Sequence, residues 1–252
     1  MARTSRHSPI KRLLHEVPRG TPLSTKELTA HGVEPKLASY YAKVGWLVRV
    51  GHGVYSLPGD EISALGATRV LARQVEGLHV GGKSALALHG VRHNLTTRPT
   101  MVLWADHRFA LPGWFTTRFP SRAVFARLFD SLDAKFARRT LSTPPGVAEP
   151  VAVSTPERAA LELLYEVGTH ESLDEARSVF EGLTNIRLDV TGRLLAACTS
   201  VKAVRLFLTW SRETGLLDVD ALRRRYDLRV GSDSRWVNRM PDGRLLFLKP
   251  YG

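Results

Sequence analysis

The chain has 252 residues, 43% of them hydrophobic and 24% charged, and this composition is that of a globular protein rather than a disordered or fibrous one. No apolar run is long enough for a transmembrane helix, and the basic residues 1–6 are not followed by the apolar segment of a signal peptide, so we expect a cytoplasmic protein that does not contact a membrane. The net charge of +12 indicates a polyanionic partner, because phosphates bound by Lys and Arg release condensed counterions.

The N-terminal region has the pattern of a helix-turn-helix. Ser24 and Glu27 have the spacing of a capping box, in which the hydroxyl accepts from a free amide and the carboxylate bonds back to the first residue. Pro35 suits the first turn of a later helix, and Gly45 ends it. Apolar spacing and these end signals predict three helices, over residues 9–17, 24–30 and 33–44.

A β-hairpin is predicted directly after the third helix. Residues 46–50 alternate like a strand, residues 51–53 (Gly-His-Gly) form a turn, and residues 54–57 return as a second strand. This is the position of the wing in a winged helix-turn-helix, so residues 1–60 are predicted to be a DNA-binding domain of that type.

The third helix has two different faces. Leu37, Tyr41 and Val44 recur at helical spacing and are expected in the core. The opposite face carries polar donors and an aromatic ring that can reach base edges, phosphates or a thymine methyl group: Lys36, Ser39, Tyr40 and Lys43. Arg49 and His52 of the wing are expected to contact the backbone or the minor groove.

The positive charge is concentrated in this region. Residues 1–59 contain nine Lys or Arg and three Glu, so +6 of the total +12 lies in less than a quarter of the chain. The alternative interpretation is a winged helix used only for protein–protein contacts, with Lys36 and Lys43 as a solvated face. Double-stranded DNA is favoured, because the excess charge coincides with the predicted recognition face.

The rest of the chain is predicted to mix helices and strands. The expected strands are residues 100–104 and 115–122, and residues 141–146 are expected to form an irregular linker. Thr155 is expected to cap the helix that begins at Pro156. Helical periodicity covers residues 61–75, 83–89, 156–167, 173–183, 190–197 and 201–214. The predicted fold class is α+β: an N-terminal winged helix-turn-helix, then a larger mixed domain, residues 61–252, with a helical C-terminal part.

Three blocks of sequence resemble one family in the same order. Residues 45–55 resemble the wing of AbiEi-family antitoxins, residues 80–90 (Val-Gly-Gly-Lys-Ser-Ala-Leu-Ala-Leu-His-Gly) resemble the helix that opens their second domain, and residues 154–165 resemble their "S-PERA-L-LLY" helix. The resemblance extends from about residue 8 to about residue 215, and the tail after Leu217 is not matched.

The resemblance implies a DNA-binding antitoxin and transcriptional repressor of a type IV toxin–antitoxin system. Such a protein binds repeats in its own promoter and counteracts a nucleotidyltransferase toxin without a required stable complex. Self-association on inverted repeats would account for cooperative binding, although nothing in the sequence fixes a dimer. The alternative is a winged-helix regulator whose second domain senses a ligand, with an apolar pocket within residues 80–210.

Residues 77–84 fit the P-loop spacing G-x-x-x-x-G-K-S, and a strand-like run ends at Asp106. A P-loop needs a strand before its first glycine, but residues 70–76 are predicted to be helical and the strand-forming residues 78–80 lie inside the motif. We interpret the match as chance. A nucleotide-binding enzyme therefore stays a minor alternative, and we expect a protein that is not an enzyme.

No metal or other cofactor is expected. Cys198 is the sole cysteine, so a disulfide within the chain and a Cys-based zinc site are excluded, and its apolar surroundings predict a core position. Four further residues are conceivable ligands, but their spacing fits no compact metal motif: His89, His93, Asp106 and His107. Two basic clusters are open to interpretation as phosphate contacts or solvated surface: Arg122, Arg127, Lys135, Arg138 and Arg139, and Arg223, Arg224 and Arg225.

Overall fold

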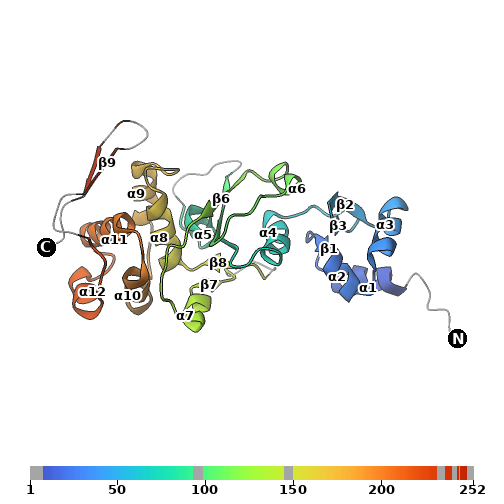
Figure 1. Ribbon diagram of the computed structural model, residues 1–252, viewed down its shortest axis with the longest axis horizontal. Coiled ribbons are helices and arrows are strands. Elements are labelled where there is room, and N and C mark those ends of the chain that lie inside the picture. The colour runs from blue at the N-terminus through green and yellow to red at the C-terminus, as the bar shows by residue number, and fades with distance from the viewer. Residues whose placement is uncertain are drawn as a thin grey trace. The chain divides into compact units, whose positions relative to one another are not determined.

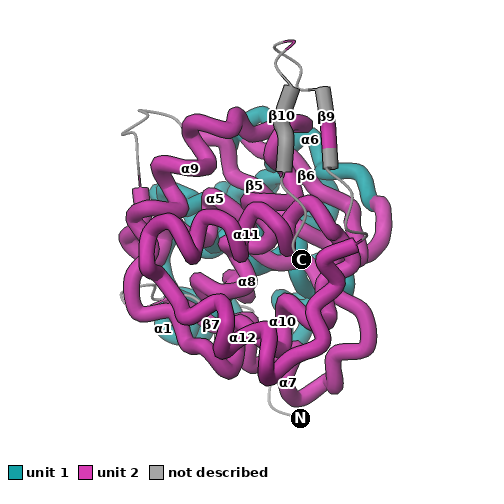
Figure 2. Tube along the Cα trace, turned by 90° about the vertical axis from the view of Figure 1, so that its left-hand side faces the viewer, with its two compact units in different colours: residues 1–76, 109–120, 149–151 teal, residues 77–108, 121–148, 152–252 magenta. Residues whose placement is uncertain are grey.

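The computed structural model describes residues 8–92, 99–144, 150–231, 236–239, 243 and 245–248. Contacts between residues divide the chain into two compact units, coloured separately in Figure 2. Unit 1 consists of residues 1–76, 109–120 and 149–151, and unit 2 consists of residues 77–108, 121–148 and 152–252. Among the described residues, no helix has the length and apolar character that crossing a membrane requires.

The N-terminal part of unit 1 alternates helices with short strands (Figure 1). In chain order its elements are α1 (Ser8–Glu16), β1 (Leu23–Ser24), α2 (Thr25–Ala30), α3 (Pro35–Lys43), β2 (Val48–Gly51) and β3 (Val54–Ser56). The strands form an antiparallel sheet in the order β1-β3-β2. The three helices and the hairpin agree with the sequence prediction, whereas the two-residue strand β1 was not predicted.

The capping box of α2 is confirmed. The Ser24 hydroxyl accepts a hydrogen bond from the Glu27 amide, and the Ser24 amide donates to Glu27 Oε2 at 2.9 Å. The helices and the hairpin then enclose one core, whose largest member, Tyr41, is fully buried. The other buried members are Ile10, Leu13, Val17, Leu23, Leu28, Val33, Ala38, Leu47, Tyr55 and Leu57.

The prediction that Val44 belongs to this core is wrong, because Val44 is 43% exposed. The helix ends at Lys43, Val44 is its C-cap, and Gly45 turns the chain with a φ of +82°. Trp46 follows the turn and packs its ring against Tyr41 at a centroid distance of 5.2 Å, where helical spacing had placed Val44.

Unit 1 also contains α4 (Ala64–Ala72) and α6 (Gly113–Thr116). The first lies within the predicted helix at residues 61–75. The second corrects the prediction of a strand over residues 115–122: Phe115 lies in a short helix, and the strand begins only at Ser121. Phe115 is fully buried and packs against Phe119 four residues later, a spacing that suits a helical turn.

Unit 2 is built on a mixed sheet in the order β6-β5-β4-β8-β7. Its strands are β4 (His79–Val80), β5 (Met101–Ala105), β6 (Ser121–Phe125), β7 (Leu141–Ser142) and β8 (Val153–Ser154). The pairs β5–β6 and β4–β8 are parallel, and β4–β5 and β7–β8 are antiparallel. Residues 141–142 are therefore an edge strand, not the start of an irregular linker.

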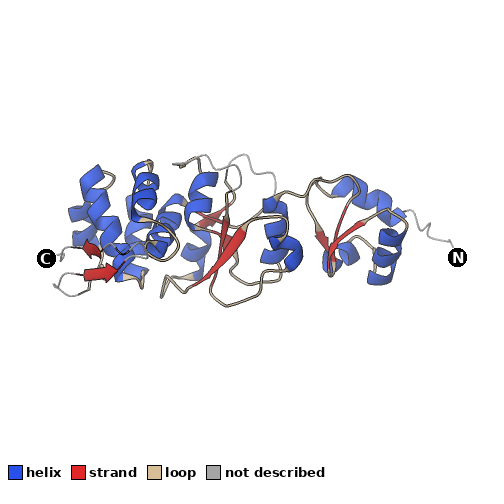
Figure 3. Cartoon of the chain, turned by 90° about the horizontal axis from the view of Figure 1, so that it is seen from above, coloured by secondary structure: helices blue, strands red, loops and turns tan. Residues whose placement is uncertain are grey.

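The helices of unit 2 are α5 (Gly82–Leu88), α7 (Ala134–Arg139), α8 (Pro156–Glu166), α9 (Leu173–Glu181), α10 (Leu188–Ala197), α11 (Val201–Thr214) and α12 (Val219–Arg225). Two of them, α5 and α7, lie between the sheet strands in the chain, and from α8 to α12 all elements are helices (Figure 3). A hairpin of β9 (Trp236–Arg239) and β10 (Leu245–Leu248) follows. Thr155 occupies the N-cap position of α8 and Pro156 begins the helix, as predicted, but the Thr155 side chain makes no capping hydrogen bond.

Helix α8 is the centre of unit 2. It packs against α5, α10 and α11 (Figure 1), and apolar residues are buried along most of its length. Three glutamates of the same helix, Glu157, Glu162 and Glu166, are buried as well, at 2%, 0% and 2% exposure. Buried carboxylates need partners. Glu157 pairs with Arg187 at 2.8 Å, and the partners of Glu162 and Glu166 are described below.

Candidate nucleic-acid interface

Helix α3 presents its predicted polar face to solvent. Lys36, Ser39, Tyr40 and Lys43 are all exposed, and Tyr40 retains 51% exposure although it is aromatic. Ala38 and Tyr41 are fully buried on the opposite side and fix how the helix is rotated on its core. The four predicted contact residues therefore lie together on one accessible helix face.

Among the described residues, the lysines on this face have no acidic partner. Lys36 and Lys43 form no ion pair within the part of the chain that the structure describes. Elsewhere in unit 1 arginines are paired: Arg69 contacts Glu27 at 2.7 Å, Arg73 also contacts Glu27, and Arg19 contacts Asp60 at 2.6 Å.

These ion pairs compensate the charges of Arg19, Arg69 and Arg73, whereas the charges of the α3 lysines are left uncompensated among the described residues. The α3 face keeps its positive potential, because no carboxylate of unit 1 pairs with its lysines in the described residues. A polyanion that binds this face displaces no carboxylate from the lysines, so counterion release contributes in full to the free energy of binding.

Arg49 of β2 is attached to the same face. Its guanidinium donates to the Tyr55 hydroxyl at 3.1 Å and to Ser39 Oγ of α3 at 3.5 Å, and it lies 5.5 Å from the centre of the Tyr55 ring. Its partners here are hydroxyl groups and a ring, not carboxylates. They hold Arg49 in position without compensating its positive charge. The structure thus brings together Ser39 and Arg49, which the sequence assigned to two different elements.

His52 lies at the tip of the hairpin, where Gly53 takes a φ of +65°. The tip is short, because Gly51 already pairs with Val54. It is also anchored: the Thr25 amide at the start of α2 donates to the Gly53 carbonyl at 2.9 Å. His52 is exposed at this fixed turn.

One apolar residue beside the basic face was not predicted as surface. Val44, at the end of α3, is 43% exposed, and with Tyr40 it gives this end of the helix an apolar component, of the kind that contacts thymine methyl groups and sugars. Val48 is 46% exposed as well, but it precedes Arg49 in β2 and lines the cavity described below, on the other face of the strand. The exposure of Val44 was not predicted, because Val44 continues the apolar spacing of the helix.

In the P-loop-like segment, residues 77–84, the groups that would bind phosphate are bonded to side chains of unit 2. Glu162 Oε2 accepts from the Gly82 amide at 2.9 Å, at the helix start where a P-loop would bind phosphate. Lys83 donates to Glu175 at 2.7 Å and to Glu171 at 3.3 Å. A Cβ on Gly81 would lie 2.4 Å from Trp104 Cδ1 and 2.5 Å from Glu162 Oε2. The two glycines therefore serve close packing here, and the segment has the geometry of a structural motif.

Glu162 is the best satisfied buried acid in unit 2. Besides Gly82, it accepts from Ser154 Oγ at 2.8 Å, from Arg158 Nε at 2.8 Å and from His79 Nε2 at 3.0 Å. Burial alone would raise its pKa, but the charges and hydrogen bonds of His79 and Arg158 lower the pKa to about 2. This network joins the sheet to α5 and α8.

The residues considered as metal ligands and the lone cysteine have structural surroundings. His89 Nε2 lies 3.0 Å from the Ser154 carbonyl, Asp106 and His107 are exposed, and His93 lies outside the described residues. The described residues contain no group of three or more His, Cys, Asp or Glu that could hold a metal ion. Cys198 is buried as predicted, and burial raises the pKa of its thiol to about 11.

The two basic clusters of unit 2 differ. Arg122 is engaged in ion pairs with Glu166 and Glu171, so it belongs to the interior network around α8. Arg127 approaches Asp130 at 3.7 Å. The remaining cluster members are exposed, on α7 (Lys135, Arg138 and Arg139) and on the last turn of α12 (Arg223, Arg224 and Arg225).

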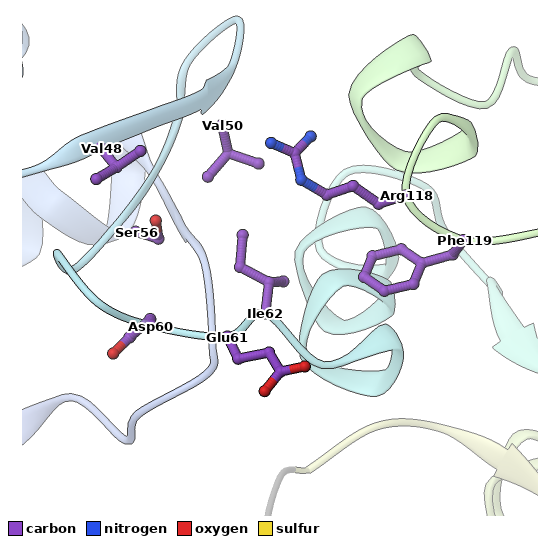
Figure 4. Close-up of a pocket in the computed structure, with 8 residues that line it drawn as sticks. All are labelled: Val48, Val50, Ser56, Asp60, Glu61, Ile62, Arg118 and Phe119. Carbon is purple, nitrogen blue, oxygen red and sulfur yellow. The ribbon is translucent and has the colours of Figure 1, made fainter.

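A cavity of about 300 Å³ opens on the hairpin within unit 1 (Figure 4). It is lined by Val48, Val50, Ser56, Asp60, Glu61, Ile62, Arg118 and Phe119. The ligand-sensing alternative placed a pocket within residues 80–210, and only Arg118 and Phe119 of this cavity come from that range.

Two family models, which together cover most of the chain, belong to one family. A family model described as "Transcriptional regulator, AbiEi antitoxin, Type IV TA system" matches residues 98–247, and one described as "Transcriptional regulator, AbiEi antitoxin N-terminal domain" matches residues 6–97. The search of curated proteins found no match. Among solved structures, the crystal structure of RV2827C protein from Mycobacterium tuberculosis aligns with a TM-score of 0.54 and 17% identity, covering 91% of this chain and 87% of that chain. At this identity the likeness concerns the fold alone.

Proposed function

This chain belongs to the AbiEi antitoxin family of transcriptional regulators of type IV toxin–antitoxin systems, and we propose that it binds double-stranded promoter DNA through α3 and the β2–β3 hairpin and represses its own promoter. In this proposal residues 1–60 form a winged helix-turn-helix. The order of three helices and a hairpin, with β1 added to the hairpin, supports that assignment.

The observation that carries the proposal is the uncompensated charge of the α3 face. Lys36 and Lys43 are exposed and form no ion pair within the described residues, and Arg49 is held beside them by neutral groups. The two lysines are seven positions apart in the helix, which corresponds to roughly 10 Å along the axis at about 1.5 Å per residue. In a major groove this spacing lets both reach phosphates while Ser39 and Tyr40 meet base edges. Arg49 and His52 contact the adjoining backbone or minor groove.

The experiment is a gel shift of the full chain on a duplex that carries the DNA upstream of its own gene. The double substitution Lys36→Ala and Lys43→Ala should weaken binding about tenfold or more, because two phosphate contacts are lost. The matched control, Lys26→Ala with Arg73→Ala, removes the same charge from unit 1 and should bind like the wild type. Equal loss in both variants would show that net charge matters and the α3 face does not.

We further propose that the larger domain counteracts a nucleotidyltransferase toxin without a required stable complex. The support is the family to which residues 98–247 belong. If repression and antitoxin activity lie in different parts of the chain, Lys36→Ala with Lys43→Ala should derepress a promoter reporter and still rescue growth when the toxin of the same operon is co-expressed. Loss of rescue by a stable, folded double variant would contradict this separation.

A further inference from the structure

The backbone of Gly51 lies directly under the ring of Trp114. A Cβ at Gly51 would lie 2.4 Å from Trp114 Cδ1, 2.6 Å from Cγ and 2.9 Å from its Cβ, distances that real Cβ atoms do not show. Gly51 is the last residue of β2, and Trp114 lies on α6, in a segment more than sixty residues later in the same unit. Glycine is needed here for close approach, not for a left-handed backbone.

Trp114 is itself firmly placed. Its ring lies 5.7 Å from the Phe115 ring at an edge-on angle of 83°, and Phe115 is fully buried. The Arg118 guanidinium donates to the Trp114 carbonyl at 3.0 Å. The indole is thus a fixed surface against which β2 rests.

The contact falls at the point where the hairpin is least regular. The pairing of β2 with β3 shifts between Arg49 and Gly51, a bulge that re-aims the side chains around it. Val50 and Val54 point to this side and form a small cluster with Val70 of α4, which Ile62 and Trp114 cover. Two proposed DNA-contacting residues, Arg49 and His52, flank the bulge and the contact.

The rest of this side of the hairpin is not filled. The cavity of about 300 Å³ separates Val48 and Val50 from Arg118 and Phe119 (Figure 4). Beside the small cluster around Val50, the contact of Gly51 with Trp114 is what holds β2 against the segment 113–119, because atoms that face each other across the cavity do not touch and contribute no restoring force. Trp114 therefore restrains β2 beside an open space.

From this geometry we infer that Trp114 is a positioning residue for the wing: it holds the β2 bulge, through Gly51, so that Arg49 and His52 are aimed at DNA. The inference rests on the proposed DNA binding. It assigns a role in that function to the segment 109–120, which lies far from α3 in the sequence and contributes no DNA contact in our proposal.

The test measures hairpin order and DNA binding separately in the full chain. By hydrogen exchange, Trp114→Ala should speed exchange of the hairpin amides, residues 48–56, and leave α2 and α3 unchanged. Trp114→Phe, which keeps a flat ring, should restore most of the protection. On the upstream duplex, Trp114→Ala should weaken binding about tenfold and lower the salt slope by about one, the contribution of Arg49. Thr116→Ala, an exposed change on the same helix, should do neither.

A double-mutant cycle with Gly51→Ala makes the contact itself falsifiable. Gly51→Ala should weaken DNA binding about tenfold in the wild type, because the new methyl group displaces the indole, but should add little to Trp114→Ala, in which the clash is gone. Additive effects, or unchanged hairpin exchange in Trp114→Ala, would overturn the inference. If hairpin exchange rises as expected while neither the wild type nor any variant binds the duplex, Trp114 holds the hairpin for another purpose and the inferred role in DNA binding is wrong, as is the proposed function.

Discussion

At the scale of single residues, Glu162 accounts for two features of unit 2. Its carboxylate satisfies the amide at the start of α5, which the sequence presented as a phosphate-binding loop, and it contacts His79 and Arg158, which come from different elements. The two ring nitrogens of His79 lie 3.0 Å from Glu162 Oε1 and 2.7 Å from the Gly77 carbonyl. The imidazole ring thus joins the turn at Gly77 to α8.

Removing the charge of Glu162 should therefore destabilise the protein strongly. Glu162→Gln leaves the half-buried Arg158 without its counterion, a change that costs about 3–5 kcal/mol in comparable pairs. Urea denaturation at pH 7 measures the loss, and the exposed Glu181→Gln serves as the control. Because the pKa of Glu162 falls from 4.5 unfolded to about 2 folded, its contribution is complete above pH 4.5 and is lost as the pH falls toward 2. A variant with wild-type stability and an unchanged acid limb would show that the network is dispensable.

At the scale of elements, local signals in the sequence predicted most helices, and tertiary contacts decided the exceptions. The capping box of Ser24 and the turn at Gly45 involve neighbours in the chain, so they could be read directly. Helix α6 and strand β7 could not, because their partners are distant: α6 packs near β2, and β7 pairs with β8 across a long connection. The candidate site was predictable because α3 and the hairpin are adjacent in sequence. The contact of Trp114 with Gly51 was not.

The end of α8 gives a prediction for pH dependence. Lys202 donates to the carbonyls of Tyr165 and Val167, both at 2.6 Å, and so caps this terminus. Burial lowers the pKa of Lys202 to about 8 from 10.5, against the opposing charge of Glu166. The folded state then binds fewer protons than the unfolded state between pH 8 and 10.5, so this group makes stability rise with pH in that window.

Lys202→Met should remove that rise. The free energy of unfolding, measured in urea from pH 7 to pH 10, should climb less steeply in Lys202→Met than in the wild type. The exposed Lys26→Met should follow the wild-type curve, because no buried amine is lost. Parallel curves for Lys202→Met and wild type would contradict the assignment of a lowered pKa.

At the scale of the whole molecule, the chain combines a small unit whose α3 lysines form no ion pair among the described residues and a larger unit whose buried glutamates pair with cations of the same unit. Unit 1 is not continuous in sequence: residues 109–120, between β5 and β6, belong to it. The boundary at residue 60 thus describes the proposed DNA-binding part but not the whole of unit 1. The place of residues 109–120 in unit 1 could not be predicted from the sequence, because no local pattern in this segment indicates that it packs against the hairpin.

The salt dependence of DNA binding tests the central claim most directly. The association constant of the full chain with the upstream duplex is measured across a series of salt concentrations, and the slope of log K against log salt gives the number of phosphates contacted. We predict that Lys36→Ala with Lys43→Ala lowers the magnitude of the slope by about two, at roughly 0.9 per lost contact, and that Lys26→Ala with Arg73→Ala leaves it unchanged. A slope that falls equally in both variants, or in neither, would contradict binding through the α3 face.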